Sequence, residues 1–317
     1  MSQVSSSIRL RKDAPNRVLM LGAFIAIYVI WGSTYLAIRY AVETIPPLIT
    51  AASRHLVAGS LLFGWAWMRG FRPTTRQWVA ALKIGALYFL VGHGLLHWAE
   101  QNVASGLAAL LIATEPMIIA LLAVIAGQER LTSMLVAGMV LGLVGVGVLM
   151  GGSGFGQQGE VLGILAVLAS SVAWSVGVHF SRRVGLPSDT LAASAMTLLC
   201  GSALLWVASE VTGEFGHLAV AAVSLKSVLG LAYLAFFGTI IAFTAYTWLL
   251  SHISATVVST HTYVNPIIAV LLGWALAGEP LNLRVVIATV VILGSIVLIR
   301  RGTHVVEVEE ELAMAED

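Results

Sequence analysis

The chain consists almost entirely of apolar runs of about 20 residues separated by short polar connections, and a run of that length crosses about 30 Å of hydrocarbon as a helix. A water-soluble domain needs a polar surface. With 58% hydrophobic and 10% charged residues, this chain cannot supply one. Inside a bilayer every backbone polar group needs an internal partner, which long continuous apolar runs obtain as helices. We therefore expect an all-α integral membrane protein.

The runs predict ten membrane-spanning helices with short connections. Their expected ranges are Val18–Ile38, Leu48–Met68, Trp78–Trp98, Gly106–Ala126, Leu131–Met150, Val161–Phe180, Thr190–Ser209, Val228–Leu250, Ala255–Leu276 and Leu281–Ile299. Residues 1–17 are expected to form a cytoplasmic tail, because the first run is too long for a signal-peptide core. Residues 301–317 are expected to form an acidic cytoplasmic tail that is disordered from Val305 onward.

The two halves of the chain repeat each other. Glu115-Pro116 lies midway along one run, and Asn265-Pro266 lies midway along another, 150 residues later. The same offset relates an upstream tryptophan, a small residue and an exit glutamate, namely Trp98 with Trp248, Ser105 with Ala255, and Glu129 with Glu279. Trp31 aligns with Trp174 less closely, at an offset of 143. Independent apolar helices have no reason to share such spacing, so residues 18–150 and 161–300 are expected to be two copies of one five-helix unit.

The positions of lysine and arginine orient these copies, because basic residues gather on the cytoplasmic side. With the N-terminus inside, that side collects twelve of them: Arg9, Arg11, Lys12, Arg17, Arg69, Arg72, Arg76, Arg130, Arg182, Arg183, Arg300 and Arg301. The outer side collects Lys226 and Arg284. Both termini are then cytoplasmic. Since five is odd, the second copy is expected to be inverted, with a central cavity between the two copies as in many secondary transporters.

Glu115 is the ionisable residue placed nearest to the predicted membrane centre, where a charge costs roughly 2.5 to 3.5 kcal/mol. Pro116 and Pro266 are expected to break their helices, and the break at Pro116 to free the carbonyls near Leu111 and Ile112. The polar residues beside these breaks would line a pocket, and the candidates are Glu115, Asn265, His261 and Tyr263. Glu115 would pair with a cationic substrate group or carry a coupling proton. The alternative is a neutral, hydrogen-bonded acid between tolerated kinks.

His93, His97 and Glu100 lie on one helical face, at positions i, i+4 and i+7. Such a stripe could relay protons or bind substrate, could ligate a divalent metal, or could pack at the membrane interface. Tyr88 lies on the same run and is a candidate for substrate binding. We assign the stripe to coupling or gating and predict no bound metal and no cofactor.

Three further features carry expectations. Arg54, within the second run, is expected to pair with Glu43, with gating or binding of a substrate carboxylate as alternatives. Trp31 and Trp174 would form aromatic walls of the cavity or simply pack. The small residues Gly138, Gly142 and Gly145 are expected to form a packing ridge on one helix.

Four stretches together resemble the EamA family of the drug/metabolite transporter superfamily: Trp31 to Arg39, Arg54 to Gly59, Trp98 to Pro116, and Asn265-Pro266 through Gly278-Glu279. The resemblance covers roughly residues 18 to 300. It implies a carrier of the bacterial inner membrane with ten helices in two inverted repeats, and an exporter of amino acids or other small metabolites. Glu115 departs from the family pattern, in which the residue before this proline is often apolar, and is therefore a candidate for specificity.

The predicted function is a secondary transporter, an exporter, that moves a small molecule across the lipid bilayer by alternating access, with proton coupling as an option. The sequence contains no nucleotide-binding motif and gives no sign of nucleic-acid binding. It is not expected to be an enzyme, since the metalloprotease and serine-hydrolase motifs are absent. The alternatives are a metal-dependent intramembrane enzyme using His93, His97 and Glu100, or a channel. The oligomeric state stays open.

Overall fold

A computed structural model describes residues 17–150, 158–181, 183–253, 255–258 and 260–316. Within these ranges the chain is helical apart from turns and short connections, and it contains no β-strand, which confirms the all-α fold. The predicted N-terminal tail up to residue 16 lies outside the described residues. Among the described residues, seven helical stretches are long and apolar enough to cross a membrane, namely Arg17–Ala41, Thr75–Ala99, Ser105–Ile125, Gly159–Ser181, Thr190–Val211, Leu225–Tyr246 and Leu283–Gly302.

Each predicted run coincides with one helix or with consecutive helical segments. Those of the first half are α1 (Arg17–Ile25), η1 (Ala26–Ile30), α2 (Trp31–Ala41), α3 (Pro47–Met68), α4 (Thr75–Gly85), η2 (Ala86–His93), α5 (Gly94–Ala99), α6 (Ser105–Ile112), α7 (Glu115–Ile125) and α8 (Ser133–Met150). Those of the second half are α9 (Gln158–Ser181), α10 (Thr190–Val211), α12 (Leu225–Tyr233), η4 (Leu234–Ile241), α13 (Ala242–His252), α14 (Ala255–Val258), α15 (His261–Ala277) and α16 (Leu283–Glu316). The short helices α11 (Glu214–His217) and η3 (Val220–Ala222) lie in the connection between two predicted runs.

Local sequence explains where several helices begin. Pro47 occupies the first turn of α3, where its missing N–H costs nothing. Thr74 and Gln77 form a reciprocal capping box at the start of α4. The Asp189 side chain accepts hydrogen bonds from two backbone N–H groups at the start of α10. These short polar signals set the boundaries of helices whose interiors are uniformly apolar.

Three helical rods contain π-helical segments that the sequence pattern does not predict. They are η1, η2 and η4, and each continues directly from one α-helix into the next. A π turn disturbs the regular i to i−4 hydrogen-bond ladder and frequently occurs at functional sites. The segments η2 and η4 start at Ala86 and Leu234, within two residues of the offset of 150 that relates the halves.

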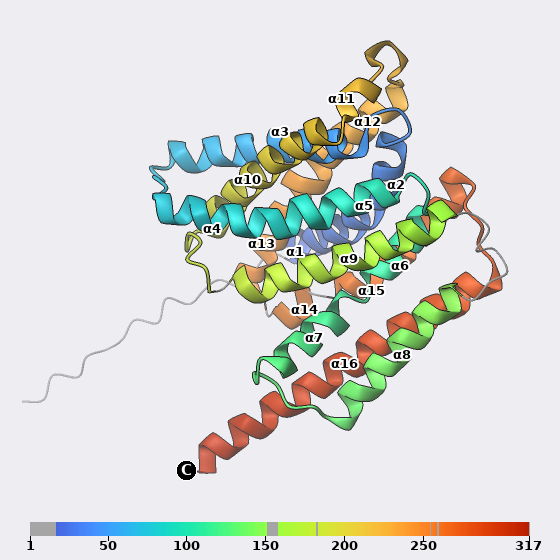
Figure 1. The fold of residues 1–317 in the computed structure, drawn as a ribbon. Coiled ribbons are helices and arrows are strands. Elements are labelled where there is room, and N and C mark those ends of the chain that lie inside the picture. The colour runs from blue at the N-terminus through green and yellow to red at the C-terminus, as the bar shows by residue number, and fades with distance from the viewer. Residues whose placement is uncertain (1–16, 151–157, 182, 254, 259, 317) are drawn as a thin grey trace, which may run out of the picture.

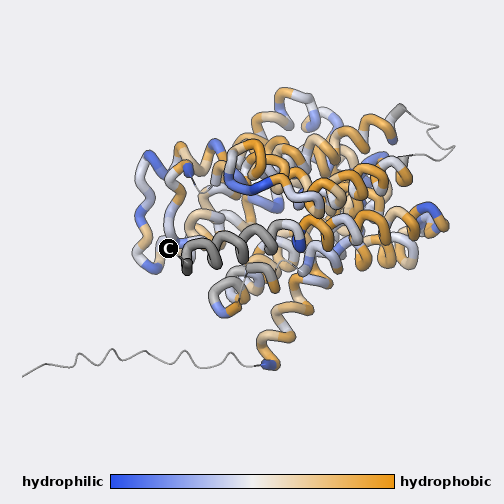
Figure 2. The backbone as a smooth tube through the Cα atoms, turned by 90° about the horizontal axis from the view of Figure 1, so that it is seen from below, coloured by the Kyte–Doolittle hydropathy of each residue, from blue (hydrophilic) through white to orange (hydrophobic). Residues whose placement is uncertain are grey.

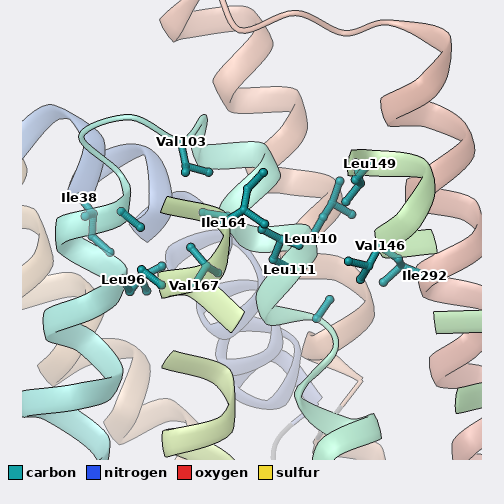
Figure 3. Packing of buried hydrophobic residues seen from close by; sticks show 14 of the residues in the cluster. Ile38, Leu96, Val103, Leu110, Leu111, Val146, Leu149, Ile164, Val167 and Ile292 are labelled. Atoms are coloured by element: carbon teal, nitrogen blue, oxygen red, sulfur yellow. The ribbon is translucent and has the colours of Figure 1, made fainter. Parts of the chain in front are cut away.

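The two halves share one hydrophobic core. Its largest buried cluster draws Leu110 and Leu111 from α6, Val167 from α9 and Ile292 from α16, among others (Figure 3). Helices α10 and α3 pack together, α15 packs on α2 and α6, and α8 pairs with α16 at one edge of the bundle (Figure 1). The halves are therefore interleaved rather than separate domains.

The outer faces of the helices are apolar as well. Large hydrophobic side chains such as Leu61, Val140 and Leu276 are more than half exposed. In Figure 2 hydrophobic residues follow the helices, while hydrophilic residues gather mainly at their ends and in the connections. This distribution suits a bundle surrounded by lipid.

The prediction of a disordered tail from Val305 is wrong for the described residues, because α16 continues as helix to Glu316. The physical reason is composition. The segment after Gly302 contains many glutamates and alanines with no proline or further glycine, and such residues favour helix when a preceding helix already supplies the first turns.

The predicted glycine ridge on α8 is confirmed as a packing surface for α16. A Cβ atom on Gly138 would lie 2.9 Å from the backbone N of Ile299 and 3.0 Å from the backbone O of Ser295. Gly145 faces Ile292 in the same way, so the two helices run antiparallel. Gly147, on the same helix, has nothing within 4 Å of such a Cβ.

We expect Gly138→Ala to lower the stability of the folded protein by about 1–3 kcal/mol, because the added methyl group meets backbone atoms that cannot move aside cheaply. Gly147→Ala is the matched control and should leave stability unchanged or slightly raised, since alanine is the better helix former. Thermal unfolding in detergent measures both. Equal midpoints for the two variants would contradict the tight packing of α8 on α16.

Candidate functional site

The interruption at Pro116 is present. Helix α6 ends at Ile112 and α7 starts at Glu115, with Pro116 in its first turn. The backbone N and the Oγ1 of Thr114 both donate to the Leu111 carbonyl, at 3.1 and 2.7 Å. The prediction that the Leu111 carbonyl would be free is therefore wrong. The Thr114 hydroxyl is thus one of the donors to the Leu111 carbonyl at the break.

The predicted break at Pro266 is misplaced. Helix α15 runs through Pro266, and the interruption lies between Val258 and His261, more than a turn earlier. With its amide oriented to suit its neighbours, the Asn265 Nδ2 donates to the carbonyls of His261, at 3.1 Å, and of Tyr28, at 3.2 Å. Asn265 thereby joins α15 to η1 of the other half.

The first of two aromatic clusters surrounds Trp31; we call it the Trp31 cluster. The indole Nε1 of Trp31 donates to the Gly238 carbonyl in η4, at 3.0 Å. The ring of Trp31 contacts the rings of Tyr246 and His261, with centroids 5.2 and 4.9 Å away. The Tyr28 hydroxyl hydrogen-bonds the Oγ1 of Thr260 at 2.6 Å. Of the predicted site residues, Trp31, His261 and Asn265 therefore meet here.

The second cluster, which we call the Trp174 cluster, lies on η2. The Trp174 ring stacks on Tyr88, with centroids 4.3 Å apart, and on His93, with centroids 5.4 Å apart and an interplanar angle of 5°. The Nδ1 of His93 and the Nε2 of His55 are 2.9 Å apart. The Nδ1 of His97 hydrogen-bonds the His93 carbonyl at 2.7 Å. The predicted residues Tyr88, Trp174, His93 and His97 are brought together.

Two consecutive residues of α3 connect these clusters. The Nη2 of Arg54 donates to Thr239 Oγ1 in η4 at 3.2 Å, next to the carbonyl that holds Trp31. His55 contacts His93 in the Trp174 cluster. The predicted Arg54–Glu43 pair is wrong, because Glu43 forms its ion pair with Lys226 at 2.6 Å on the exposed rim. Arg54 is buried and points inward instead.

Several buried polar atoms near this bridge have no hydrogen-bond partner in the described part of the chain. They are Arg54 Nε, His55 Nδ1, His97 Nε2 and both carboxylate oxygens of Glu100. Leaving such groups unpaired costs about 1–3 kcal/mol each, and more for a charged group. A native structure that tolerates several in one place is one in which water, a proton or a ligand completes them.

Glu100 directly follows the apolar stretch that ends at Ala99. Burial, assisted by the nearby Glu279 carboxylate, raises the pKa of Glu100 well above its ordinary value, while Arg39 and Arg54 oppose this shift. Tyr35 on α2 lies within electrostatic range of both Glu115 and Glu100.

Some predicted features lie elsewhere or find no support. Tyr263 is not part of either cluster; its ring lies 5.1 Å from the Arg300 guanidinium. Among the described residues no three His, Cys, Asp or Glu side chains are placed to hold a metal, so the metal interpretation of the His93 stripe gains nothing. A hollow of about 580 Å³ is lined by Leu131, by Ser133 and by apolar side chains of α8. None of the predicted site residues lines it.

Sequence reasoning missed one cross-half contact altogether. The carboxylate of Glu279, after α15, accepts hydrogen bonds from the backbone N of Ser105 and of Gly106, at 2.7 and 3.0 Å, and lies 3.6 Å from Arg39 Nε. The signal was available, since Ser105 and Glu279 both belong to the features repeated at an offset of 150. The hydrogen bond between the Ser105 backbone and the Glu279 carboxylate, however, depends on the tertiary structure.

Replacing Trp31 with Phe should reduce stability by about 1–3 kcal/mol, because the Gly238 carbonyl loses its buried indole donor. Trp274, which is 54% exposed, provides the control, and Trp274→Phe should change little. Thermal unfolding in detergent compares the two. If both variants unfold at the same temperature, the cross-half hydrogen bond of Trp31 does not stabilise the bundle.

Comparison with known proteins agrees with this architecture. The model of the EamA-like transporter family matches twice, at residues 18–151 and 161–301. The chain is 37% identical over 287 residues to "Uncharacterized inner membrane transporter YedA" of Escherichia coli strain K12, covering 90% of this chain and 92% of that protein. It is 27% identical over 291 residues to "Uncharacterized transporter YvbV" of Bacillus subtilis, covering 91% of this chain and 93% of that one.

A solved crystal structure shares the fold, with a TM-score of 0.59 at 22% identity. The match covers 91% of this chain and 99% of the chain in that structure. That likeness concerns the fold alone. The two family matches between them span both halves of the chain, including the Trp31 and Trp174 clusters. This chain belongs to the EamA-like transporter family.

Proposed function

We propose that this chain is a secondary transporter in which two inverted five-helix repeats, residues 18–150 and 161–300, give alternating access to a site between them. One observation carries the proposal. Trp31 of the first half is bonded to η4 of the second, and Trp174 of the second half is stacked on η2 of the first. Reciprocal packing of equivalent elements is what a two-fold repeat produces, and carriers of this design bind substrate at the interface between repeats.

The site would lie between the Trp31 and Trp174 clusters, around Arg54. The buried Arg54, with its unpartnered Nε, suits an anionic group of the substrate, and Glu100 or Glu115 suits a cationic group or a coupling proton. Trp31, Trp174, Tyr88 and His261 would supply the aromatic walls, as in many small-molecule sites. Asn265 would hold η1 against α15 at the edge of this site, and Tyr263 would have a structural role beside Arg300.

The substrate would be a small metabolite that carries both charges, such as an amino acid, and the direction would be export. Both expectations come from the family resemblance together with the charged groups of the site. YedA is named as an inner membrane transporter, which supports the same location for this chain. The basic residues of the connections favour cytoplasmic termini.

Transport by purified protein in proteoliposomes tests the proposal. We expect saturable uptake of one labelled amino acid or other zwitterionic metabolite, accelerated by the unlabelled compound on the opposite side, because a carrier exchanges its substrate. Uptake that neither saturates nor shows this acceleration would indicate a channel.

We expect Glu115→Gln to reduce transport at least about tenfold at unchanged abundance, because it removes a half-buried acid that holds a cationic group or a proton. If Glu115 carries the proton, the residual activity should also lose its dependence on pH. Glu43→Gln removes a carboxylate from the exposed rim and is the matched control, which should retain transport. Full activity of Glu115→Gln with an unaltered pH profile would exclude Glu115 from the mechanism.

A further inference from the structure

Four arginines gather at one end of the bundle, on two connections that come from different halves of the chain. Arg69 and Arg72 lie between α3 and α4, Arg76 lies in the first turn of α4, and Arg183 lies between α9 and α10. A Cβ atom on Gly185, in the second connection, would lie 3.6 Å from the Arg76 Nε, so the two connections lie side by side (Figure 1). We call the four arginines the arginine face.

The arginine face carries positive charge that no described residue neutralises. All four side chains are exposed, and none of them forms an ion pair with a described residue. Asp189 follows Arg183 on the same connection, but its Oδ1 accepts two backbone N–H groups at the start of α10. At the other end of α3, by contrast, Lys226 is paired with Glu43 at 2.6 Å. A cluster of unpaired positive charges attracts an anionic partner.

Arg72 is held in place although it is exposed. Its Nη1 donates to the carbonyls of Trp67 and Phe71, both at 2.9 Å, and its guanidinium lies 3.8 Å from the centroid of the Trp67 ring. The N–H groups of its Nε and Nη2 make no hydrogen bond to a described residue. These groups form one edge of the planar guanidinium and match two oxygens of a phosphate. Because the side chain is already ordered, binding there costs little side-chain entropy.

The surroundings of the arginine face favour a lipid phosphate over a soluble one. The Arg69 guanidinium lies over the Trp65 ring, 5.4 Å from its centroid. Trp65, Trp67 and Met68 are exposed at the end of α3, and Leu61 continues this apolar surface along the helix. Tryptophans of this kind are typical of the membrane interface, where the phosphates of lipids lie. A phosphate at the level of the arginines can therefore place its acyl chains along α3.

We propose that the arginine face binds the headgroup of an anionic phospholipid, with the Nε and Nη2 of Arg72 on the phosphate and the other three arginines adding attraction. In the orientation predicted from the basic residues this end is cytoplasmic, and the lipids of that leaflet carry negative charge. The headgroup would touch both halves of the chain, since the two connections belong to different halves. This site is independent of transport, so its absence would leave the proposed transport function untouched.

Native mass spectrometry of the full chain in detergent measures the binding. The protein is titrated with dioleoylphosphatidylglycerol, with dioleoylphosphatidylcholine, which has the same acyl chains and no net charge, and with glycerol phosphate, which has no acyl chains. We expect phosphatidylglycerol to bind at least about fivefold more tightly than phosphatidylcholine, because each arginine near the headgroups attracts an anionic lipid by about this factor. Glycerol phosphate should bind more weakly than phosphatidylglycerol, and higher ionic strength should weaken the binding of phosphatidylglycerol.

Arg72→Gln should weaken phosphatidylglycerol binding by about fivefold or more, because the charge and the paired N–H groups are lost. Arg72→Lys keeps the charge without the planar edge and should give an intermediate affinity. Arg76→Gln should weaken binding about fivefold without disturbing the carbonyls at the end of α3. Lys226→Gln is the matched control and should leave binding unchanged, because Lys226 also lies 3.8 Å from the centroid of a ring, that of Tyr40, but is paired with Glu43.

Four results would overturn the lipid site. They are equal affinities for phosphatidylglycerol and phosphatidylcholine, glycerol phosphate binding as tightly as phosphatidylglycerol, an equal loss of binding in Lys226→Gln and Arg72→Gln, and wild-type affinity in both Arg72→Gln and Arg76→Gln. Wild-type affinity of Arg72→Lys would overturn the role of the guanidinium edge. If Arg72→Gln fails to fold, Arg69→Gln and Arg76→Gln decide, and wild-type affinity in both of them overturns the site.

Discussion

Inside a bilayer every backbone N–H and C=O must find a partner within the protein, and three irregular or terminal segments of the described bundle find theirs across the two halves. The Gly238 carbonyl in a π segment accepts from the Trp31 indole. The Tyr28 carbonyl in another accepts from Asn265. The first N–H groups of α6 donate to Glu279. In all three cases the partner comes from the other half, so these three places join the halves.

The same device recurs within the outer layer of helices. The Glu214 carboxylate accepts from the backbone N of Leu48 and of Ile49 at the start of α3. The Ser202 hydroxyl donates to the Ala52 carbonyl across the α10–α3 contact. Further hydrogen bonds join α2 to α12, such as Ser33 Oγ with the Tyr233 hydroxyl, and close glycine contacts and apolar surfaces make up much of the remaining contact. A bundle of this kind combines broad apolar contact with a small number of specific attachment points.

The polar centre of the bundle is built from side chains. Arg54 and His55 lie on a helix that touches both tryptophan clusters, and nitrogens of Arg54, His55 and His97 and the carboxylate oxygens of Glu100 are buried there without a hydrogen-bond partner in the described part of the chain. Backbone groups are satisfied by side chains, whereas several side chains remain incompletely paired. In a transporter this is the expected distribution, because groups that exchange partners during transport must be side chains while the helices themselves stay intact.

The sequence by itself determined the membrane class, the helices and the repeat, because these follow from local composition and spacing. The glycine ridge on α8 was equally readable, since small residues at helical spacing have few other uses in lipid. Tertiary structure decided the rest. Pro266 stays within α15, Arg54 bonds to Thr239 rather than pairing with Glu43, and Glu279 caps a helix 173 residues away in sequence. Each depends on which partner a buried polar atom meets, and that is set by how distant helices pack and not by their own residues.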